Sequence, residues 1–502
     1  MNIPNRIAEI VRSPKFFYAT VALLVLQAVW LALSGGYPMA FDEDFHVGVI
    51  RLYADHLLPV WSTHPAGGDA FGAVARDPSY MYHYLMSFPY WLTGLVTNNE
   101  VVRIMVLRFI NIALLASCLP LYRRLLLKTG ASRALVHAGL LLFVLIPIVP
   151  FLGAQVNYDN MILPLTALTL LLALRVVESI KLKQFDMQAL GWLLIVGLFS
   201  SIVKYAYLPI FVAVIGFVIV RAFKMYRTPT KTRAAIQTSW RQLHSRSRWL
   251  LVALLLVTSA LVGERYVGNV ARYHTPVPDC AQVLNYDHCK SYGPWIRDYD
   301  FEQAKSADAD KSVIRYSQHW LYGMWFRTYF AVDGAQSDYE TRGPLTLPAI
   351  GGLLSCVAGV LAFCLMARRL WRRPQSHVFT LFSVVIVVYV AILWLTEYQL
   401  YVQTAVPVAI NGRYLLPVLP LAIIMTILGV RELLGKHTGL QTTVAVGLLI
   451  CSLWGGGALT YILRSSDAWY WPDTPLTSVN HAIKRVAGPI TPGYDMPVQF
   501  LH

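Results

Sequence analysis

The sequence predicts an all-α polytopic membrane protein. Of its 502 residues, 56% are hydrophobic and only 14% are charged, whereas about a quarter of the residues in a soluble domain are charged. Apolar runs of about 20 residues, long enough to cross about 30 Å of hydrocarbon, recur along nearly the whole chain. These runs leave no room for a large soluble core. We therefore expect one transmembrane domain over residues 1–464 and a tail over residues 465–502.

About eleven membrane spans are expected. The first begins about 16 residues from the N-terminus and lacks an A-x-A-like cleavage site, so we interpret it as a retained anchor and not as a signal peptide. The predicted spans begin near residues 16, 102, 134, 160, 187, 205, 249, 345, 378, 414 and 442.

Basic segments predict the orientation. "RRLLLKTGASR" (123–133), "RAFKMYRTPTKTRAAIQTSWRQLHSRSR" (221–248) and "ARRLWRRP" (367–374) alternate with the spans so that all three lie on one side. Lys and Arg are enriched in cytoplasmic loops. We therefore expect the N-terminus in the cytoplasm and the C-terminus outside, in a bacterial inner membrane or a plasma membrane.

The net charge is +15, from 42 basic and 27 acidic residues. Most of the basic clusters belong to the predicted cytoplasmic face, where the positive-inside rule and anionic lipid head groups account for them. We therefore expect these basic residues to contact membrane lipids, and we expect the protein to bind no nucleic acid.

Four segments are expected outside the membrane, at residues 37–100, 154–160, 265–343 and 397–413. The first contains "EDFHVGVIRLYADH" and "YMYHYLMSFPYWLTGL", two stretches typical of interfacial helices. The loop 265–343 is rich in Trp and Tyr, whose rings suit sugar stacking and interface anchoring equally well. The proline-containing tail predicts an ordered lid or strap.

Cys280 and Cys289 share the predicted outside loop, in "CAQVLNYDHC". A local disulfide fits this spacing in an oxidising compartment, whereas a zinc site would need two more ligands in a recognisable spacing. The other four cysteines fall in predicted spans, where a thiol behaves as a small apolar group.

The acidic cluster in "FDEDFH" follows the first span. If residues 43–56 form a helix, Asp42 is its N-cap, while Glu43 and His46 lie one turn apart on its polar side. Phe45, Val49 and Leu52 would then form a stripe that faces the membrane. Partial desolvation at the interface could tune a carboxylate as a general base. The alternative is that Asp42 only caps the helix.

Asp44 shares this cluster, and its alternative interpretation is a carboxylate on a solvated face. The histidines His46, His64 and His83 show no H-x-x-x-H or H-E-x-x-H spacing, so we expect no histidine metal site. A divalent cation held by carboxylates stays open. The chain has no glycine-rich phosphate loop and no G-x-S-x-G motif, which argues against a nucleotide-driven machine.

Five further polar residues interrupt or border apolar runs. Asp159 either serves function at the mouth of a span or caps a helix. Lys204 and Arg413 either clamp a phosphate together or extend to lipid phosphates. Arg108 and Asn111 are expected to face inward, where they contact either the acidic cluster or a ligand.

The pattern resembles the GT-C glycosyltransferases, polytopic enzymes that take sugars from polyprenyl-phosphate carriers. The resemblance rests on "DEDFH", "VNYDNMILPLTALTLLLALR", "KYAYLPIF" and "NGRYLLPVLPLAIIMTILGV", which together span residues 40 to 430. The last segment is similar to "GRYLLP" of bacterial phospholipid-carrier-dependent transferases. The family includes protein O-mannosyltransferases and the transferase that adds aminoarabinose to lipid A.

The resemblance implies a GT-C-like fold and roles for individual residues. Asp42 would be the catalytic base, with Glu43 or Asp44 and His46 as supporting groups. Lys204 and Arg413 would bind the phosphate of the carrier. The donor would be a polyprenyl-phosphate hexose or pentose, and no nucleotide would be required.

After the last predicted span we expect only the tail 465–502, and not the large soluble C-terminal domain of several GT-C branches. Its loops and its tail would therefore have to recognise the acceptor, which could be a glycan, a lipid-linked oligosaccharide or a protein. The rival functions are a polyprenyl-linked lipid transporter or flippase, a polymerase of surface polysaccharide, and a structural assembly subunit. A transporter would be favoured by broken helices in symmetric halves, which the sequence does not show.

Overall fold

The computed structural model describes residues 3–40, 42–306, 309–329, 346–435, 437–465 and 469–493. Parts of the predicted loop 265–343 and of the predicted tail lie outside these described residues. Within them every regular element is a helix, and the one isolated β-bridge joins Gly35 to Tyr470. The chain is therefore an all-α protein over its described part.

The helices include three short 3-10 turns, η1, η2 and η4, and one π-helical turn, η3. In chain order the elements are α1 Ile3–Arg12, α2 Pro14–Ser34, α3 Glu43–His56, η1 Asp69–Phe71, α4 Met81–Gly94, α5 Glu100–Leu127, α6 Arg133–Leu145, α7 Ile148–Gly153, α8 Asp159–Lys181, α9 Met187–Val203, η2 Tyr205–Tyr207, α10 Leu208–Tyr226, α11 Pro229–Gln242, α12 Ser245–Val262, η3 Gly263–Val267, α13 Gly268–Tyr273, α14 Cys280–Val283, α15 Tyr286–Cys289, α16 Gly293–Ala304, α17 Val313–Tyr329, α18 Leu347–Trp371, α19 Ser376–Thr404, η4 Gly412–Leu415, α20 Leu419–Leu434, α21 Thr438–Leu453, α22 Ala458–Arg464 and α23 Pro475–Ala487.

Seven helical stretches of the described chain are long and apolar enough to cross a membrane, and a bent pair formed by α21 and α22 raises this number to eight. The protein is therefore a multi-pass membrane protein. Each of the eleven predicted spans coincides with a helix. However, α6, α9 and α20 have only 13, 17 and 16 residues, fewer than the roughly 20 that a straight span needs.

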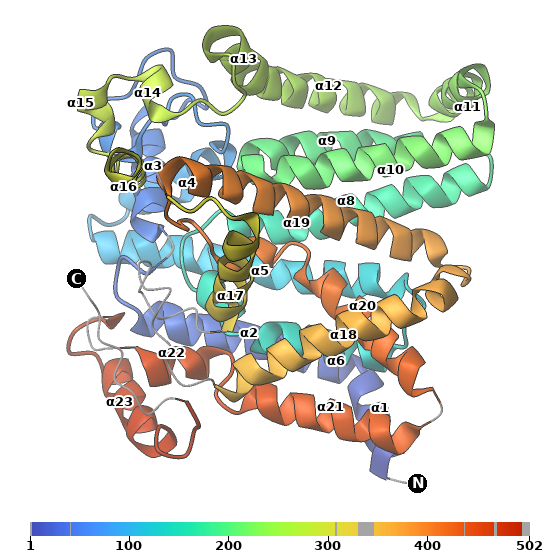
Figure 1. Cartoon of the computed structure of the whole chain (residues 1–502). Helices are drawn as coiled ribbons and strands as arrows, with labels where there is room; N and C mark the ends of the chain where they lie inside the picture. The colour runs from blue at the N-terminus through green and yellow to red at the C-terminus, as the bar shows by residue number, and fades with distance from the viewer. Residues whose placement is uncertain are drawn as a thin grey trace.

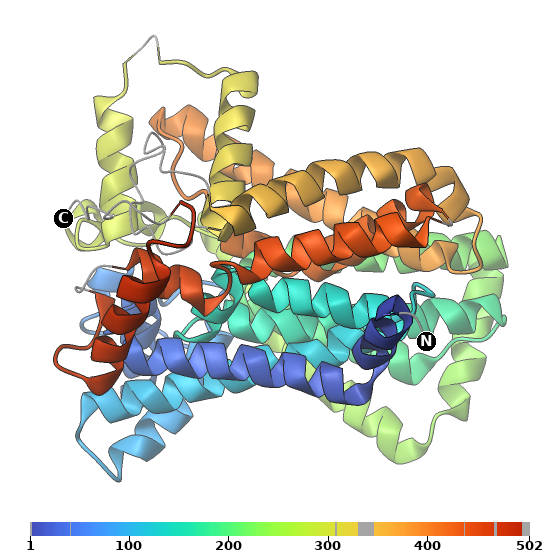
Figure 2. The same ribbon diagram turned by 90° about the horizontal axis from the view of Figure 1, so that it is seen from below.

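The long helices lie side by side, and their two ends differ (Figures 1 and 2). One end carries α1 and α11, and the opposite end carries α3, α4, α14, α15, α16, α22 and α23 (Figure 1). Helices of the first predicted outside segment (α3 and α4) and of the long one (α14, α15 and α16) thus lie at a single end of the bundle. We call this the loop-rich end.

Small residues let two of the apolar helices approach closely. A Cβ atom at Gly359 of α18 would lie 2.0 Å from the methyl group of Thr426, and one at Gly429 of α20 would lie 2.8 Å from the backbone nitrogen of Phe363. Van der Waals contact between backbones is a main source of helix association in lipid. These two glycines therefore fix how close α18 and α20 can pack.

The described part of the tail packs against the end of α2. The backbone N–H of Gly36 donates to the carbonyl of Trp469 at 2.8 Å, and that of Trp471 donates to the carbonyl of Ser34 at 3.1 Å. The indole of Trp30 donates to Asn480 of α23 at 2.8 Å. The tail therefore lies beside the connection that leads from α2 into the acidic cluster.

The two expected helices of the first loop are present as α3 and α4, but the predicted faces of α3 are wrong. Val49 is 1% exposed and does not face lipid, and Phe45 packs edge-on against Phe71 and His83. Glu43 and His46, expected on a polar side, are also buried. The reason is that α4 and η1 pack against α3 while Arg108 of α5 holds Glu43, so burial does not follow one stripe.

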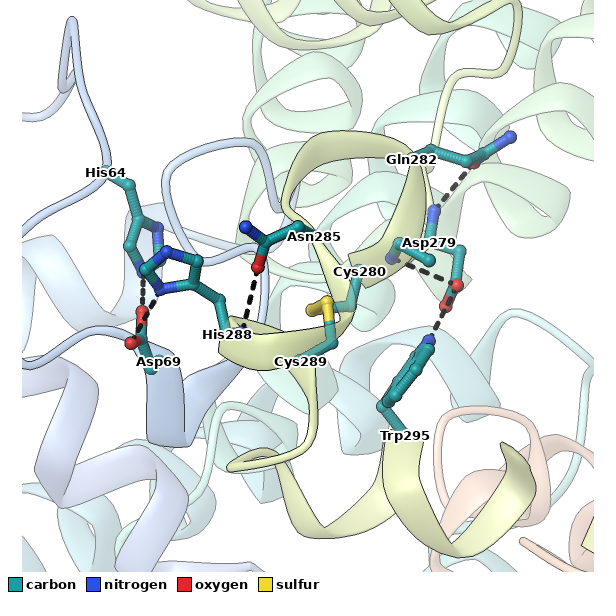
Figure 3. The surroundings of a disulfide bond; sticks show 10 residues. His64, Asp69, Asp279, Cys280, Gln282, Asn285, His288, Cys289 and Trp295 are labelled. Atoms are coloured by element: carbon teal, nitrogen blue, oxygen red, sulfur yellow. Dashed lines mark hydrogen bonds and ion pairs between the residues drawn. A yellow bond between two sulfur atoms is a disulfide. The ribbon is translucent and has the colours of Figure 1, made fainter. Parts of the chain in front are cut away.

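A disulfide joins Cys280 and Cys289, whose Cα atoms are 5.8 Å apart, and closes a small loop that contains α14 and α15 (Figure 3). His288 on this loop contacts Asp69 of η1 at 2.8 Å, and His64 contacts the second oxygen of the same carboxylate at 3.0 Å. Asp69 therefore connects the disulfide loop to the first loop of the chain (Figure 3).

Candidate active site

Asp42 lies at the loop-rich end, directly before α3. Its φ angle is +69°, and among the described residues its side chain accepts no capping hydrogen bond from α3. Instead, Nη2 of Arg413 donates to Oδ2 of Asp42 at 2.6 Å. The Asp42 side chain remains 46% exposed. The interpretation of Asp42 as a simple helix cap is therefore wrong, and its carboxylate is available to a ligand.

Arg413 projects from η4 into the interior of the bundle. Its side chain is 5% exposed, and the amide oxygen of Asn411 accepts from its backbone N–H at 3.0 Å. A Cβ atom at the preceding Gly412 would lie 2.1 Å from the hydroxyl of Thr328. Glycine is therefore needed at this position so that η4 can pass close to α17 and carry Arg413 to Asp42.

Lys204 occupies the break between α9 and η2, in an extended conformation. Its Nζ atom donates to Oδ1 of Asp159 at 2.5 Å, and the two side chains are 7% and 3% exposed. Asp159 is the first residue of α8, and its Oδ2 atom is buried without a hydrogen-bond partner among the described residues. Lys204 therefore meets an internal anion and does not extend to lipid phosphates.

Tyr414 lies between the two cations. The Nζ atom of Lys204 is 5.0 Å from the centroid of its ring, and the guanidinium carbon of Arg413 is 5.2 Å from it. The ring of Tyr158 lies 4.6 Å from the same Nζ atom. An aromatic face stabilises a cation that has lost water. The site thus holds two buried cations around one ring, each paired with a carboxylate.

Glu43 is fully buried and anchors the start of α3. Its Oε1 atom accepts from the backbone N–H of Val156 at 3.0 Å and its Oε2 atom from that of Met39 at 2.8 Å. Arg108 of α5 donates to both oxygens, at 2.8 and 2.7 Å. Glu43 therefore positions the loop around Asp42 and has no free oxygen lone pair directed at solvent.

Every hydrogen-bond donor of the Arg108 side chain has a partner inside the protein. Besides Glu43, it donates to three backbone carbonyls at the end of α2, those of Ala32, Gly35 and Gly36, at 2.7–2.9 Å. These contacts use all five N–H groups of a guanidinium. Of the two predicted alternatives, the structure shows Arg108 in contact with the acidic cluster.

Asn111, one turn further along α5, has a similar internal role. Its side-chain oxygen accepts from the Tyr82 hydroxyl at 2.8 Å, from Asn160 at 3.0 Å and from the backbone of Asn157 at 3.3 Å. Because this oxygen already serves three donors, Asn111 orders the segment that precedes Asp159.

His46 belongs to a buried chain of imidazoles. Its Nδ1 atom lies 2.9 Å from Nε2 of His83, whose Nδ1 atom lies 3.0 Å from the carbonyl of Ser79. A carbonyl only accepts, so the neutral rings carry their protons on Nδ1 and leave Nε2 of His46 as an acceptor. Burial lowers the pKa of His83 to about 3 and that of His46 well below its usual value. Both rings are neutral near pH 7.

Asp44 borders an open cavity of about 480 Å³ together with Asp42. The cavity is also bounded by Arg297 of α16 and by Trp469 of the tail. Neither Arg297 nor Trp469 stands out in the sequence as a site residue. Both belong to segments rich in aromatic residues, but no local pattern indicates that they reach the acidic cluster.

The carboxylates of the site are poorly suited to a divalent cation. Among the described residues, no group of three or more His, Cys, Asp or Glu side chains is arranged to hold a metal ion. Asp42 and Asp159 each pair with a cationic side chain, which competes with a metal for the same oxygens. We therefore derive no chemical step through a metal.

Comparisons with known proteins assign no family to this chain. No protein-family model, no curated protein and no solved structure matches the chain. The resemblance to the GT-C glycosyltransferases thus stays a prediction that rests on the residues themselves.

Proposed function

We propose that the protein is an inverting glycosyltransferase that moves a sugar from a polyprenyl-phosphate carrier to an acceptor hydroxyl on the outer face of the membrane, in the synthesis of an envelope glycan or glycolipid. The observation that carries this proposal is the contact between Asp42 and Arg413. A half-exposed carboxylate at an open cavity touches a buried cation inside an apolar bundle. This arrangement suits a base on one side and a leaving phosphate on the other.

The cations would bind the donor. A polyprenyl phosphate has its lipid among the spans and its phosphate at their ends, where Lys204 and Arg413 lie around Tyr414. Arginine recognises phosphate through two parallel hydrogen bonds, and lysine acts as a point charge. Their present partners, Asp159 and Asp42, keep the site neutral before the donor arrives.

Asp42 would act as the general base. It takes the proton of the acceptor hydroxyl while the hydroxyl oxygen attacks the anomeric carbon of the donor. The bond between that carbon and the phosphate oxygen breaks, and polyprenyl phosphate leaves with its extra negative charge next to Arg413 and Lys204. A single displacement inverts the anomeric centre. Glu43 and His46 would act indirectly, by holding the start of α3.

The main rival is a transporter of polyprenyl-linked lipids. The buried pair of Lys204 and Asp159 would suit it, because intramembrane ion pairs often mark transport pathways. A transporter, however, needs no half-exposed carboxylate at a cavity next to the cations. Catalysis therefore accounts for Asp42 better than transport does.

The deciding experiment measures release of polyprenyl phosphate by the full-length protein in lipid nanodiscs. The protein receives a panel of polyprenyl-phosphate hexoses and pentoses together with crude envelope acceptor. We expect release from one donor and a loss of at least 100-fold in Asp42→Asn, since a positioned base contributes about 10²–10⁴-fold. Asp55→Asn, on the exposed side of α3, is the matched control and should stay within twofold.

Two results would overturn the assignment. The first is activity of Asp42→Asn within threefold of wild type, about 0.7 kcal/mol in activation free energy. The second is saturable binding of polyprenyl phosphate without release from any donor, which would favour the transporter.

A further inference from the structure

The cavity beside Asp42 is built from three distant parts of the chain. The α2–α3 connection and the first turn of α3 contribute Asp42 and Asp44, the second turn of α16 contributes Arg297, and the tail contributes Trp469. Its volume of about 480 Å³ lies within the range of ordinary small-molecule sites. The sugar donor does not account for these groups, because Lys204 and Arg413, the cations that suit its phosphate, do not line this cavity.

Trp469 is held firmly at the edge of this cavity. Its carbonyl accepts from the backbone N–H of Gly36 at 2.8 Å and from the hydroxyl of Tyr461 at 2.9 Å. Its ring packs edge-on against Phe151, with centroids 6.4 Å apart. The indole is partly exposed. A fixed, partly exposed aromatic face offers flat apolar contact at little cost in side-chain entropy.

The charges around the cavity leave a local excess of negative charge. Asp42 is paired with Arg413 at 2.6 Å and Arg297 with Asp298 at 2.7 Å. Asp44 has no ion-pair partner among the described residues. An anionic ligand would therefore meet an uncompensated carboxylate, whereas hydroxyl groups could donate to it.

We propose that this cavity is the acceptor site and that it binds a neutral saccharide. One face of the sugar packs on the indole of Trp469, its hydroxyl groups donate to Asp44, and the reacting hydroxyl reaches Asp42. This inference rests on the proposed transferase function and narrows its acceptor to a glycan.

The other acceptor classes fit the cavity less well. A lipid tail would need apolar lining that continues into the spans, but the lining comes from a connecting segment, the end of one helix and the tail. A peptide that binds as an added strand would need an exposed strand edge, and the described residues contain no strand. A saccharide requires only the aromatic face and hydrogen-bonding groups that are present.

The test measures binding and needs no turnover. Full-length protein in nanodiscs is titrated by saturation-transfer NMR with neutral hexose disaccharides, with a disaccharide that contains a uronic acid, and with a serine- and threonine-containing peptide. We expect a neutral disaccharide to bind at least fivefold more tightly than the uronic acid. Trp469→Ala should weaken its binding at least tenfold and Trp469→Phe less than threefold. Trp454→Ala, an exposed tryptophan at the end of α21, is the control and should change nothing.

A second variant guards against simple misfolding. Asp44→Lys should reverse the preference, so that the uronic acid binds more tightly than the neutral disaccharide, and a misfolded protein cannot gain affinity in this way.

Binding of polyprenyl phosphate is measured on the same samples, so that failure of the saccharide inference can be distinguished from failure of the transferase proposal. If the protein binds polyprenyl phosphate but no saccharide, or binds the peptide in a Trp469-dependent way instead, the saccharide inference is overturned and the transferase proposal stands. If it binds neither polyprenyl phosphate nor saccharide, both are overturned. Equal binding of neutral and acidic disaccharides would refute the argument from Asp44.

Discussion

The buried pair of Glu43 and Arg108 makes a quantitative prediction about stability. Both side chains are fully buried, and the guanidinium also serves three carbonyls at the end of α2. Arg108→Met keeps most of the side-chain volume but removes every one of these donors. The carboxylate of Glu43 would then keep only two backbone N–H groups, those of Met39 and Val156.

The expected cost follows from these contacts. Removing one partner of a buried ion pair typically costs about 3–5 kcal/mol, because the other charge stays buried without compensation. Each carbonyl that loses its donor adds to this cost, so Arg108→Met should fall near the upper end of the range. The double variant Glu43→Gln, Arg108→Met should cost less than the sum of the single variants, with a coupling free energy of about 0.5–3 kcal/mol.

Unfolding in mixed detergent and SDS micelles, followed by the helical circular dichroism signal, measures these free energies. The matched control is Arg51→Met, because Arg51 pairs with Glu100 while both side chains are about 40% exposed (42% and 39%). An exposed pair contributes about 1 kcal/mol at most. If Arg108→Met destabilises the protein no more than Arg51→Met does, the view of Glu43 and Arg108 as a buried anchor is refuted.

Two further predictions concern the site and the disulfide loop. Lys204→Ala should weaken binding of polyprenyl phosphate at least tenfold. Asp159→Asn should strengthen this binding, because it frees the ammonium of Lys204. Equal dissociation constants in both variants and in the wild type would contradict the role of Lys204 in binding phosphate. Replacing Cys280 and Cys289 by Ser should make residues 275–305 more sensitive to limited proteolysis, because a disulfide that closes so short a loop contributes about 2–3 kcal/mol. Unchanged cleavage would show that the His288–Asp69 contact is sufficient to hold this loop in place.

The positions of the helices were predictable because each one depends on local sequence. A run of apolar residues forms a helix in lipid wherever it occurs, so each predicted start near residues 16 to 442 coincides with a helix. The lengths of α6, α9 and α20 were harder to predict, because Gly, Pro and polar residues end these helices early.

The partners within the site could not be predicted in the same way. Asp42 and Arg413 are 371 positions apart in the sequence, and Lys204 and Asp159 are 45 apart. Their polarity marked each of them as unusual in an apolar chain, but only packing decides which cation meets which carboxylate. The same limit explains the error about Glu43: its partner Arg108 is on another helix, and the acidic cluster was only one of the two contacts expected for Arg108.

The four charged residues that form the two ion pairs around Tyr414 all lie where helices end. Asp42 precedes α3, Asp159 begins α8, Lys204 separates α9 from η2, and Arg413 lies in η4 before α20. Helix ends bring charge into an apolar bundle without breaking a span, and pairing keeps the desolvation cost of each charge tolerable. On the proposed function this pairing has a mechanistic consequence. A donor phosphate that binds Nη2 of Arg413 competes there with Asp42, so the arrival of the leaving group loosens the contact that holds the base.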